Sequence, residues 1–375
     1  MKCLRCQNED PRLFAQDHGV WYCRRCIGFS RLDVGMPVQP ANLSRRKLPV
    51  RPVMNYSLTE HQAQASAQAL SHLKAGYDVF MYAATGAGKT ECTLESICYY
   101  LKAGKKVCFA ISRRQVVLEI RARMQSFFPD LNVIAVCQGY TDVTDGDLIV
   151  CTTHQLYRYP YAFDLLILDE VDAFPYAGNA LLESIAAQSC IGQILYLSAT
   201  PDETFRKAMK AGKMKEVCLF ERPHHHPIPV PQIKQMPAWM QVLFILSFCH
   251  HHTEPILVFV PTKADCIWMA GLLRCPYIHS GTENKDEQME AFRDHQFSRL
   301  VCTTLLERGI TVANVQVLVY QGQHAVFTSA SLIQIFGRVG RSFDAPQGEA
   351  ICLCRYADDS VKDCVRQLQQ MNDYV

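Results

Sequence analysis

The chain has 375 residues, enough for about two domains, and its 49% hydrophobic and 20% charged residues are typical of a globular protein. No apolar run approaches the roughly 20 residues of a membrane span, and the polar residues directly after Met1 exclude a secretory signal. The net charge is only +2, but residues 1–56 hold ten Lys or Arg against four Asp or Glu. This local excess of positive charge could bind a polyanion.

Two pairs of cysteines lie close to the N-terminus. Cys3 and Cys6 form one Cys-x-x-Cys pair, Cys23 and Cys26 form another, and sixteen residues separate the two pairs. Four soft thiolates on one tetrahedral ion favour Zn²⁺, and the ion would supply folding energy that so small a core lacks. We therefore predict a structural zinc-ribbon module over residues 1–35. Disulfides or scattered thiols are the alternative, whereas most of the remaining cysteines are expected to be buried thiols in a reducing compartment.

Residues 36–56 show no hydrophobic periodicity. They contain several prolines and the basic cluster Arg45, Arg46 and Lys47. We interpret them as a basic linker that leads into the first large domain.

A glycine-rich loop follows the short apolar strand expected over residues 79–82. Its residues are Thr85, Gly86, Ala87, Gly88, Lys89 and Thr90, and a helical pattern follows from residue 91 to residue 101. A strand, a glycine-rich loop and a helix in this order form the context of a phosphate-binding loop. Lys89 would pair with the β- and γ-phosphates of a nucleotide, and the Thr90 hydroxyl would hold Mg²⁺. The strict pattern has glycine at position 83, where this chain has alanine, so a chance glycine-rich turn is the alternative.

Two carboxylates end the next buried strand, expected over residues 165–168. Because ligands bind at the carboxyl ends of parallel strands, Asp169 would hold Mg²⁺ through water and Glu170 would activate the attacking water. An ordinary acidic turn is the alternative, and the phosphate-binding loop about eighty residues upstream makes it improbable. Ser198, Ala199 and Thr200 follow a further strand over residues 193–197.

A second large domain begins after a Pro- and His-rich stretch. The expected ranges are 57–221 for the first domain, 222–240 for a linker and 241–375 for the second domain, in which strands and helices alternate again. Arg338 and Arg341 are three residues apart, so on a continuous helix they would share a face and could clamp a transition-state phosphate. A solvated basic patch is the alternative. We expect the runs His224–His226 and His250–His252 to lie in exposed loops or helix ends rather than to bind metal.

Taken in order, these motifs resemble those of superfamily 2 helicases and translocases, whose core is two tandem RecA-like α/β domains with parallel sheets flanked by helices. By this resemblance, the family's numbered motifs correspond to residues 85–90 (motif I), 169–172 (motif II), 198–200 (motif III), 303–311 (motif V) and 334–341 (motif VI). The resemblance covers about residues 57–355. It implies ATP and Mg²⁺ as cofactors and assigns Gln62 to adenine recognition. It implies a catalytic set of Lys89, Asp169, Glu170, Gln334, Arg338 and Arg341. It also implies DNA contacts from Arg113, Arg114, Thr153, Thr303 and Thr304, and coupling roles for Asp172, Ser198, Thr200, Glu307 and Gly309.

Within this superfamily, the four-cysteine module directly ahead of a compact core resembles the ComFA family of late-competence DNA-uptake ATPases. That resemblance implies a single-stranded DNA motor in the cytoplasm, at the inner face of the membrane and held there by partners. The implied partners are the phosphoribosyltransferase-like ComFC, the DNA-uptake channel and single-strand-binding or recombination loaders, and self-association stays open. The alternatives are a genome-maintenance helicase, a zinc-bearing nucleic-acid binder with a vestigial ATPase, and an RNA rather than a DNA substrate.

Overall fold

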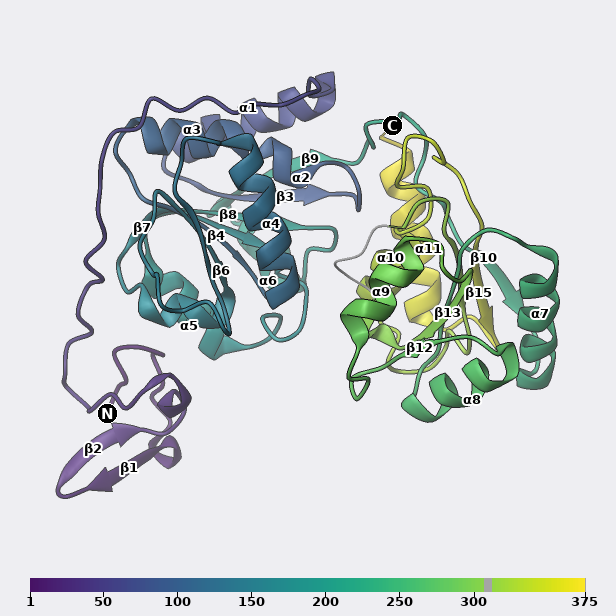
Figure 1. The fold of residues 1–375 in the computed structure, drawn as a ribbon. Helices are drawn as coiled ribbons and strands as arrows, with labels where there is room; N and C mark the ends of the chain where they lie inside the picture. Colours follow the sequence, from purple (N-terminus) through teal and green to yellow (C-terminus); the bar gives the residue numbers. More distant parts are fainter. Residues whose placement is uncertain (307–311, 375) are drawn as a thin grey trace. The chain divides into compact units, whose positions relative to one another are not determined.

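A computed structural model describes residues 1–306 and 312–374. The chain forms two compact units, Met1–Tyr82 with Lys89–Cys218 and Ala83–Gly88 with Leu219–Val375. Each unit contains a parallel sheet with helices beside it (Figure 1), so the predicted class of two α/β domains is confirmed. Among the described residues, no helix is both long and apolar enough to cross a membrane.

Seven strands form the sheet of the first unit, in the order β5-β6-β4-β7-β8-β3-β9. The pairings among the first six of these are parallel. Their runs of Val, Ile, Leu and Phe are buried almost throughout, as expected for parallel strands covered on both faces. The strands are β3 (Asp78–Ala83), β4 (Val107–Ile111), β5 (Val133–Val136), β6 (Leu148–Thr152), β7 (Phe163–Asp169), β8 (Cys190–Ser198) and β9 (Met214–Leu219).

Helices cover both faces of this sheet. Those preceding β7 are α1 (Glu60–Lys74), α2 (Lys89–Cys92), α3 (Leu94–Lys102), α4 (Arg114–Phe127) and the 3-10 helix η3 (Thr153–Arg158). Later in the chain come α5 (Ala180–Ser189) and α6 (Glu203–Lys210). Side chains of η3, α5 and α6 share one apolar cluster with the sheet, and Figure 1 shows α1 and α3 on the opposite side from α5. The helix expected over residues 91–101 is divided between α2 and α3 at Thr93.

The N-terminal module is a small hairpin with two single-turn helices. Its elements are η1 (Pro11–Leu13), β1 (Phe14–Asp17), β2 (Val20–Cys23) and η2 (Ile27–Phe29). β1 and β2 pair antiparallel, and the four cysteines and Phe14 form the module's own core. Five buried side chains are too few to stabilise a fold by burial alone, which is consistent with a module that depends on a metal.

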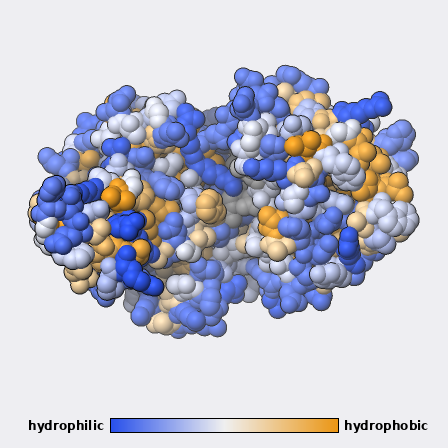
Figure 2. All heavy atoms as spheres, turned by 90° about the horizontal axis from the view of Figure 1, so that it is seen from below, coloured by the Kyte–Doolittle hydropathy of each residue, from blue (hydrophilic) through white to orange (hydrophobic). Residues whose placement is uncertain are grey.

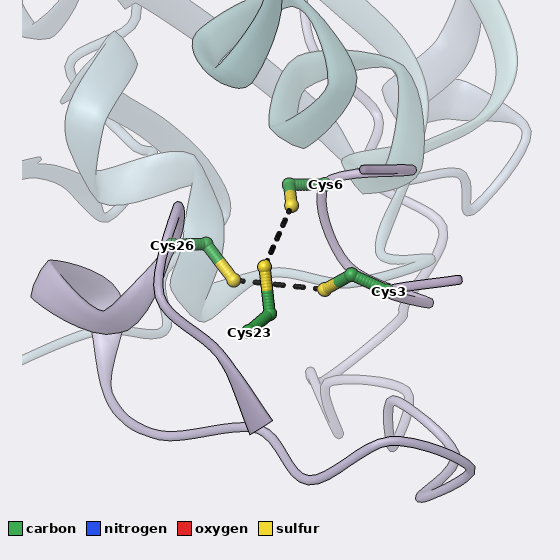
Figure 3. A group of neighbouring side chains, drawn as sticks. All are labelled: Cys3, Cys6, Cys23 and Cys26. Carbon is green, nitrogen blue, oxygen red and sulfur yellow. Dashed lines mark hydrogen bonds between the residues drawn. The ribbon is translucent and has the colours of Figure 1, made fainter. Parts of the chain in front are cut away.

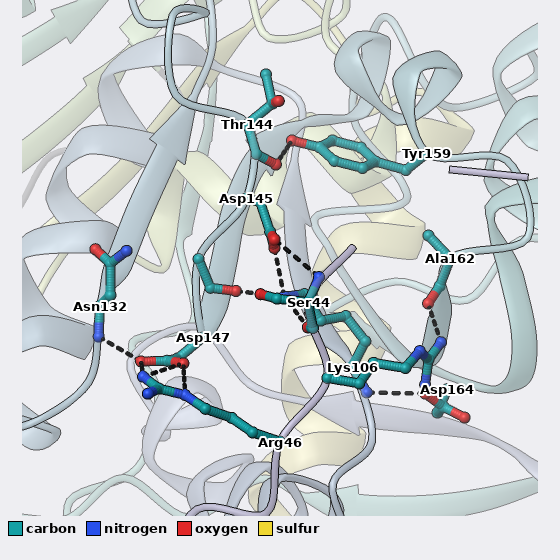
Figure 4. A network of polar contacts seen from close by, with 12 residues as sticks. Ser44, Arg46, Lys106, Asn132, Thr144, Asp145, Asp147, Tyr159, Ala162 and Asp164 are labelled. Carbon is teal, nitrogen blue, oxygen red and sulfur yellow. Dashed lines mark hydrogen bonds and ion pairs between the residues drawn. The ribbon is translucent and has the colours of Figure 1, made fainter. Parts of the chain in front are cut away.

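Residues 37–54 have no helix or strand, yet they bind closely to the first unit (Figure 1). The Lys106 side chain, 3% exposed, donates from Nζ to Asp145 (2.6 Å) and to the carbonyl oxygens of Ser44 (3.0 Å) and Gly146 (2.5 Å). Arg46 forms a bidentate pair with Asp147, donating from Nε to Oδ1 at 3.0 Å and from Nη2 to Oδ2 at 2.9 Å (Figure 4).

The other arginine of the basic cluster is also engaged. Arg45 forms an ion pair with Asp164 and donates to the carbonyl oxygen of Ala162. Two of the cationic side chains that we considered for polyanion binding are therefore neutralised by aspartates of the sheet. We call residues 37–56 the strap.

Six strands form the sheet of the second unit, in the order β10-β15-β14-β11-β13-β12, and every pairing in it is parallel. The strands are β10 (Gln232–Gln235), β11 (Ile256–Phe259), β12 (Tyr277–Ile278), β13 (Arg299–Cys302), β14 (Gln316–Val319) and β15 (Ala350–Cys354). The helices are α7 (Ala238–His251), α8 (Lys263–Leu273), α9 (Lys285–Arg293), α10 (Ser329–Phe336), α11 (Asp359–Asn372) and the 3-10 turn η4 (Thr304–Leu306). The range 222–240, which we expected to be a linker, contains the edge strand β10 and the start of α7.

The surface is mainly polar. Hydrophilic side chains cover most of the face drawn in Figure 2, with smaller hydrophobic areas between them. The largest exposed apolar side chains of the second unit include Trp239 on α7 and Trp268 on α8. The same helices expose further apolar side chains, Met240 and Leu243 on α7 and Ile267 and Leu272 on α8.

Candidate functional site

The predicted nucleotide-binding motifs follow three neighbouring strands of the first sheet, and all three strands end at the same edge of the sheet. The phosphate-binding loop follows β3, Asp169 ends β7 and Ser198 ends β8, the strand between them. The register pairs Tyr82 with Ser198 and Asp169 with Leu197, so the strands end within about one residue of each other. This edge is where open parallel sheets bind their ligands.

The phosphate-binding loop needs its glycines for backbone geometry. Gly86 and Gly88 have φ values of +82° and +85°, a region that residues with a Cβ avoid. The chain then enters α2 at Lys89, so the loop joins a strand to a helix as the motif requires. Thr85 and Thr90 are buried beside it, at 4% and 7% exposure.

Asp169 and Glu170 occupy a buried, strained turn. Burial raises the pKa of Asp169 to about 6, while the charge of Lys89 acts in the opposite direction. Glu170 has a φ of +55°, and its N–H donates to Asp169 Oδ1 at 2.9 Å and to the Leu197 carbonyl at 3.1 Å. A left-handed conformation in a non-glycine residue costs about 1–3 kcal/mol and is typical of residues held in place for function. A bound cation would offset the raised pKa, so this pair is suited to Mg²⁺.

The end of motif II is bonded to motif III. Thr200 Oγ1 donates to Asp172 Oδ2 at 2.6 Å, and the Thr200 N–H donates to Ser198 Oγ at 3.0 Å. A movement of the loop after β8 would therefore displace the loop after β7 through this hydrogen bond. This bond gives a physical basis for the coupling roles that the family resemblance implies.

Gln62 lies at the first turn of α1. Its Oε1 accepts from the Thr59 N–H at 3.0 Å, its own N–H donates to Thr59 Oγ1 at 3.3 Å, and the side chain is 4% exposed. This reciprocal capping box fixes the start of the helix. The Gln62 carbonyl also accepts from Cys92 of α2, which brings α1 next to the nucleotide loop's helix.

The residues of the first unit that we predicted to contact DNA follow two adjacent strands. Arg113 and Arg114 come after β4 and Thr153 comes after β6, and the register pairs the ends Ile111 and Thr152. Arg114 also has protein partners, because its Nε donates to the Gln138 carbonyl at 2.8 Å and its guanidinium lies 5.7 Å from the Tyr140 ring centroid.

In the second unit, one expectation about motif VI is wrong. Gln334 lies on α10 and is 4% exposed, but the helix ends at Phe336 and does not continue to Arg341. Residues 337–340 form a turn in which Gly340 has a φ of +66°. Arg338 therefore lies within this turn and Arg341 directly after it, rather than both on one helix face.

The reason is a buried arginine that the sequence analysis missed. Arg222, 1% exposed, donates from Nη1 to the carbonyls of Val339 (2.7 Å) and Gly340 (2.8 Å) and from Nη2 to that of Gly337 (2.8 Å). In a continuing α-helix these carbonyls would point along the helix axis and accept from N–H groups four residues later, so they could not bind Arg222 in this way. Burial and the neighbouring Arg341 lower the pKa of Arg222 to about 9.

Neighbouring side chains add to this turn. Arg341 Nε donates to the Gly337 carbonyl at 2.8 Å, and His224 Nε2 lies 2.8 Å from the Gly340 carbonyl. The sequence signal for Arg222 was only its place beside His224–His226, in a stretch that we had interpreted as a linker.

Part of motif V lies outside the described residues. Thr303 and Thr304 follow β13 and are partly exposed, with Thr304 opening η4. Glu307 and Gly309, to which we assigned coupling roles, are outside the described ranges.

The four N-terminal cysteines form a compact, buried cluster (Figure 3). The Sγ atoms of Cys3 and Cys26 lie 3.6 Å apart, as do those of Cys6 and Cys23, and all four lie within 4.8 Å of one another. Tetrahedral Zn–S bonds of about 2.3 Å place sulfurs about 3.8 Å apart, so the cluster fits zinc closely.

Thiols within the cluster are also hydrogen-bonded to one another. The hydrogen bond with Cys26 lowers the pKa of the Cys3 thiol, and the same bond raises the pKa of Cys26. The Asn8 side-chain amide also lies 3.9 Å from Cys23 Sγ, a contact that would stabilise a thiolate. Among the described residues, this is the one group of three or more His, Cys, Asp or Glu side chains that lie close enough together to share a metal ion.

Comparison with known proteins shows similarity along almost the whole chain. Residues 55–203 match the model of the res subunit of type III restriction enzymes, and residues 236–343 match the helicase conserved C-terminal domain. Competence protein ComFA of Bacillus subtilis is 30% identical, covering 99% of this chain and 86% of that protein. Competence protein ComFA of Streptococcus pneumoniae is 32% identical, covering 99% and 90%. The chain belongs to the ComFA family.

Solved structures agree on the fold. Saccharomyces cerevisiae Dbp5, bound to RNA and ADP BeF3, matches with a TM-score of 0.59 at 16% identity, covering 85% of this chain and 93% of that chain. With the two family models and the ComFA relatives, this makes the chain a superfamily 2 helicase, and the solved structures show its RecA-like fold. It is a DNA-dependent ATPase and helicase of the competence system, and its fold implies ATP and Mg²⁺ as cofactors.

Proposed function

We propose that the chain is a motor that moves single-stranded DNA with the energy of ATP and drives the uptake of transforming DNA across the cytoplasmic membrane. The observation that carries this proposal is the convergence of motifs I, II and III at one edge of the first sheet, in a chain whose relatives are competence proteins. A genome-maintenance role has no comparable observation in its favour.

ATP chemistry would be divided among named residues. Lys89 would bind the β- and γ-phosphates, Thr90 and Asp169 would hold Mg²⁺, and Glu170 would orient and deprotonate the attacking water. The motif VI residues Arg338 and Arg341, with Gln334 near the γ-phosphate, would stabilise its developing charge. Asp172 and Thr200 would pass the change at the γ-phosphate to the loop after β8.

Single-stranded DNA would be held through its backbone. Arg113, Arg114, Thr153, Thr303 and Thr304 would contact phosphates, so affinity would be independent of sequence and would fall with salt. Because Arg45 and Arg46 are paired with aspartates, the strap would add little to this binding.

The module would bind Zn²⁺ through Cys3, Cys6, Cys23 and Cys26 as a closed structural site with no open position for catalysis. We assign the protein to the inner face of the cytoplasmic membrane. Partners would hold it there, among them the phosphoribosyltransferase-like ComFC, the uptake channel and the proteins that receive the incoming strand.

The test is ATP hydrolysis with no nucleic acid, oligo(dT), duplex DNA and single-stranded RNA, compared for the wild type, Lys89→Ala and Lys102→Ala. Lys102 is an exposed lysine on α3 and serves as the control. We expect strong stimulation by oligo(dT) alone, loss of about 100-fold or more in turnover for Lys89→Ala with DNA binding retained, and no change for Lys102→Ala. Stimulation by RNA instead, or full turnover in Lys89→Ala, would contradict the proposal.

A further inference from the structure

One aromatic side chain of the N-terminal module packs against a 3-10 helix beside the sheet of the first unit. The ring of Phe29, on η2, lies 5.3 Å from the ring of Tyr157 and 6.2 Å from that of His154, centroid to centroid, at interplanar angles of 49° and 28°. His154 and Tyr157 both belong to η3. That 3-10 helix begins at Thr153, the residue that follows β6 and that we assigned to the DNA backbone.

Phe29 is tied directly to the cysteine cluster. It lies three residues after Cys26, and its N–H donates to the Cys26 carbonyl at 3.0 Å. Arg5, between the ligands Cys3 and Cys6, donates from Nη1 to the carbonyls of Phe29 (3.0 Å) and Ser30 (2.8 Å). Both Cys-x-x-Cys pairs therefore set the position of the Phe29 backbone.

The contact is part of a wider interface with the first unit. Phe29 and Leu181 of α5 each pack against both apolar clusters, that of the module and that of the sheet. Gln188 of α5 donates to the Leu4 carbonyl at 2.6 Å. Beyond η3, the Ala41 N–H of the strap donates to the Pro160 carbonyl at 2.9 Å.

The 3-10 helix η3 needs such support. It spans six residues, and 3-10 helices longer than three or four residues are uncommon because their hydrogen bonds are poorly aligned. Leu156 anchors it from the core, with 1% exposure, whereas His154 and Tyr157 are only partly buried. Phe29 packs against both of these partly buried side chains.

We infer that Phe29 is a positioning residue through which the zinc module holds η3, and with it Thr153, in the geometry for binding single-stranded DNA. The inference deepens the proposed function and rests on it for the role of Thr153. The metal cluster then has a mechanical role in DNA binding although none of its ligands contacts DNA.

The experiment compares the full-length wild type with Phe29→Ala, Phe29→Leu and Trp21→Ala. Trp21 is a 41% exposed aromatic residue on β2 of the same module, so its substitution controls for the loss of an aromatic ring. Four quantities are measured: bound zinc, hydrogen exchange of residues 153–158, affinity for fluorescent oligo(dT), and ATP hydrolysis without DNA.

For Phe29→Ala we expect full zinc content, faster exchange in residues 153–158, oligo(dT) affinity lower by about threefold to tenfold, and unchanged basal hydrolysis. Phe29→Leu should restore much of the affinity, and Trp21→Ala should match the wild type. Unchanged exchange in η3, or faster exchange with unchanged oligo(dT) affinity, overturns the inference. If the wild type itself does not bind oligo(dT), the proposed function fails, and the exchange of η3 alone then decides whether Phe29 holds this helix.

Discussion

Arg222 shows how one side chain can determine the geometry of a catalytic motif. All of its hydrogen bonds described above are to backbone carbonyls of residues 337–340, and no helix could use those acceptors at the same time. A buried guanidinium is tolerated there because each of its three nitrogen atoms donates to a carbonyl, Nε to that of Thr85 at 3.0 Å and the two Nη atoms to those of the turn. Arg338 lies within this turn and Arg341 directly follows it, so the placement of both depends on Arg222.

Replacing Arg222 should therefore impair hydrolysis more than nucleotide binding. For Arg222→Met we expect kcat to fall by about tenfold or more with a smaller change in KM, and the free energy of unfolding to fall by about 2 kcal/mol. Arg222→Lys keeps a charge but cannot reach three carbonyls, so it should also be impaired. The control is Arg355→Met, at an exposed position of the second unit. Normal kcat in Arg222→Met would show that the turn holds its shape without the guanidinium.

At the scale of elements, the strap is built on charge pairs rather than on periodicity. Lys106 immediately precedes β4, Asp145 and Asp147 lie just before β6, and Asp164 lies near the start of β7. The strap therefore crosses the edge of the sheet opposite the nucleotide-binding motifs. Burial raises the pKa of Asp145, but hydrogen bonds from Lys106 and Ser44 lower it more, so the pKa lies below its usual value.

Lys106→Met should destabilise the first unit in a pH-dependent way. At neutral pH we expect a loss of about 1–3 kcal/mol, because Asp145 and two carbonyls lose their buried donor. A carboxyl with a depressed pKa contributes stability that is present above its unfolded value of about 4 and is lost as the pH falls through the folded value. Urea unfolding should therefore show the gap between wild type and variant narrowing below about pH 4. A difference in stability that does not change with pH would contradict a stabilising ion pair between Lys106 and Asp145. Lys102→Met, at an exposed position, is the control.

The zinc module should unfold as a unit without its metal. Cys23→Ser removes one of four ligands, and we expect loss of zinc and rapid hydrogen exchange over residues 1–35. The sheet of the first unit should keep its protection, because its core is separate from that of the module. Full zinc content in Cys23→Ser would contradict the four-cysteine site.

Most regular elements could be predicted because their signals are local. The apolar runs that became β7 and β11, the cysteine spacing and the glycine-rich loop each lie within a few residues of one another. The strap contacts could not, because Arg46 and Asp147 are 101 residues apart and no local pattern links them. The end of α10 was missed for the same reason, since Arg222 acts from 115 residues away.

For the whole molecule, the central claim is that this ComFA-family chain is a motor on single-stranded DNA. Family membership and the convergence of motifs I, II and III support ATP-driven action on DNA. Movement along a strand is a further property, because an ATPase can be stimulated by DNA without travelling on it.

The most direct measurement is translocation on oligo(dT) strands of increasing length with a fluorophore at one end. After ATP and Mg²⁺ are added, we expect the time to reach the labelled end to increase linearly with strand length, with no such signal in Lys89→Ala. Arrival times independent of length, with DNA-stimulated hydrolysis intact, would contradict the motor.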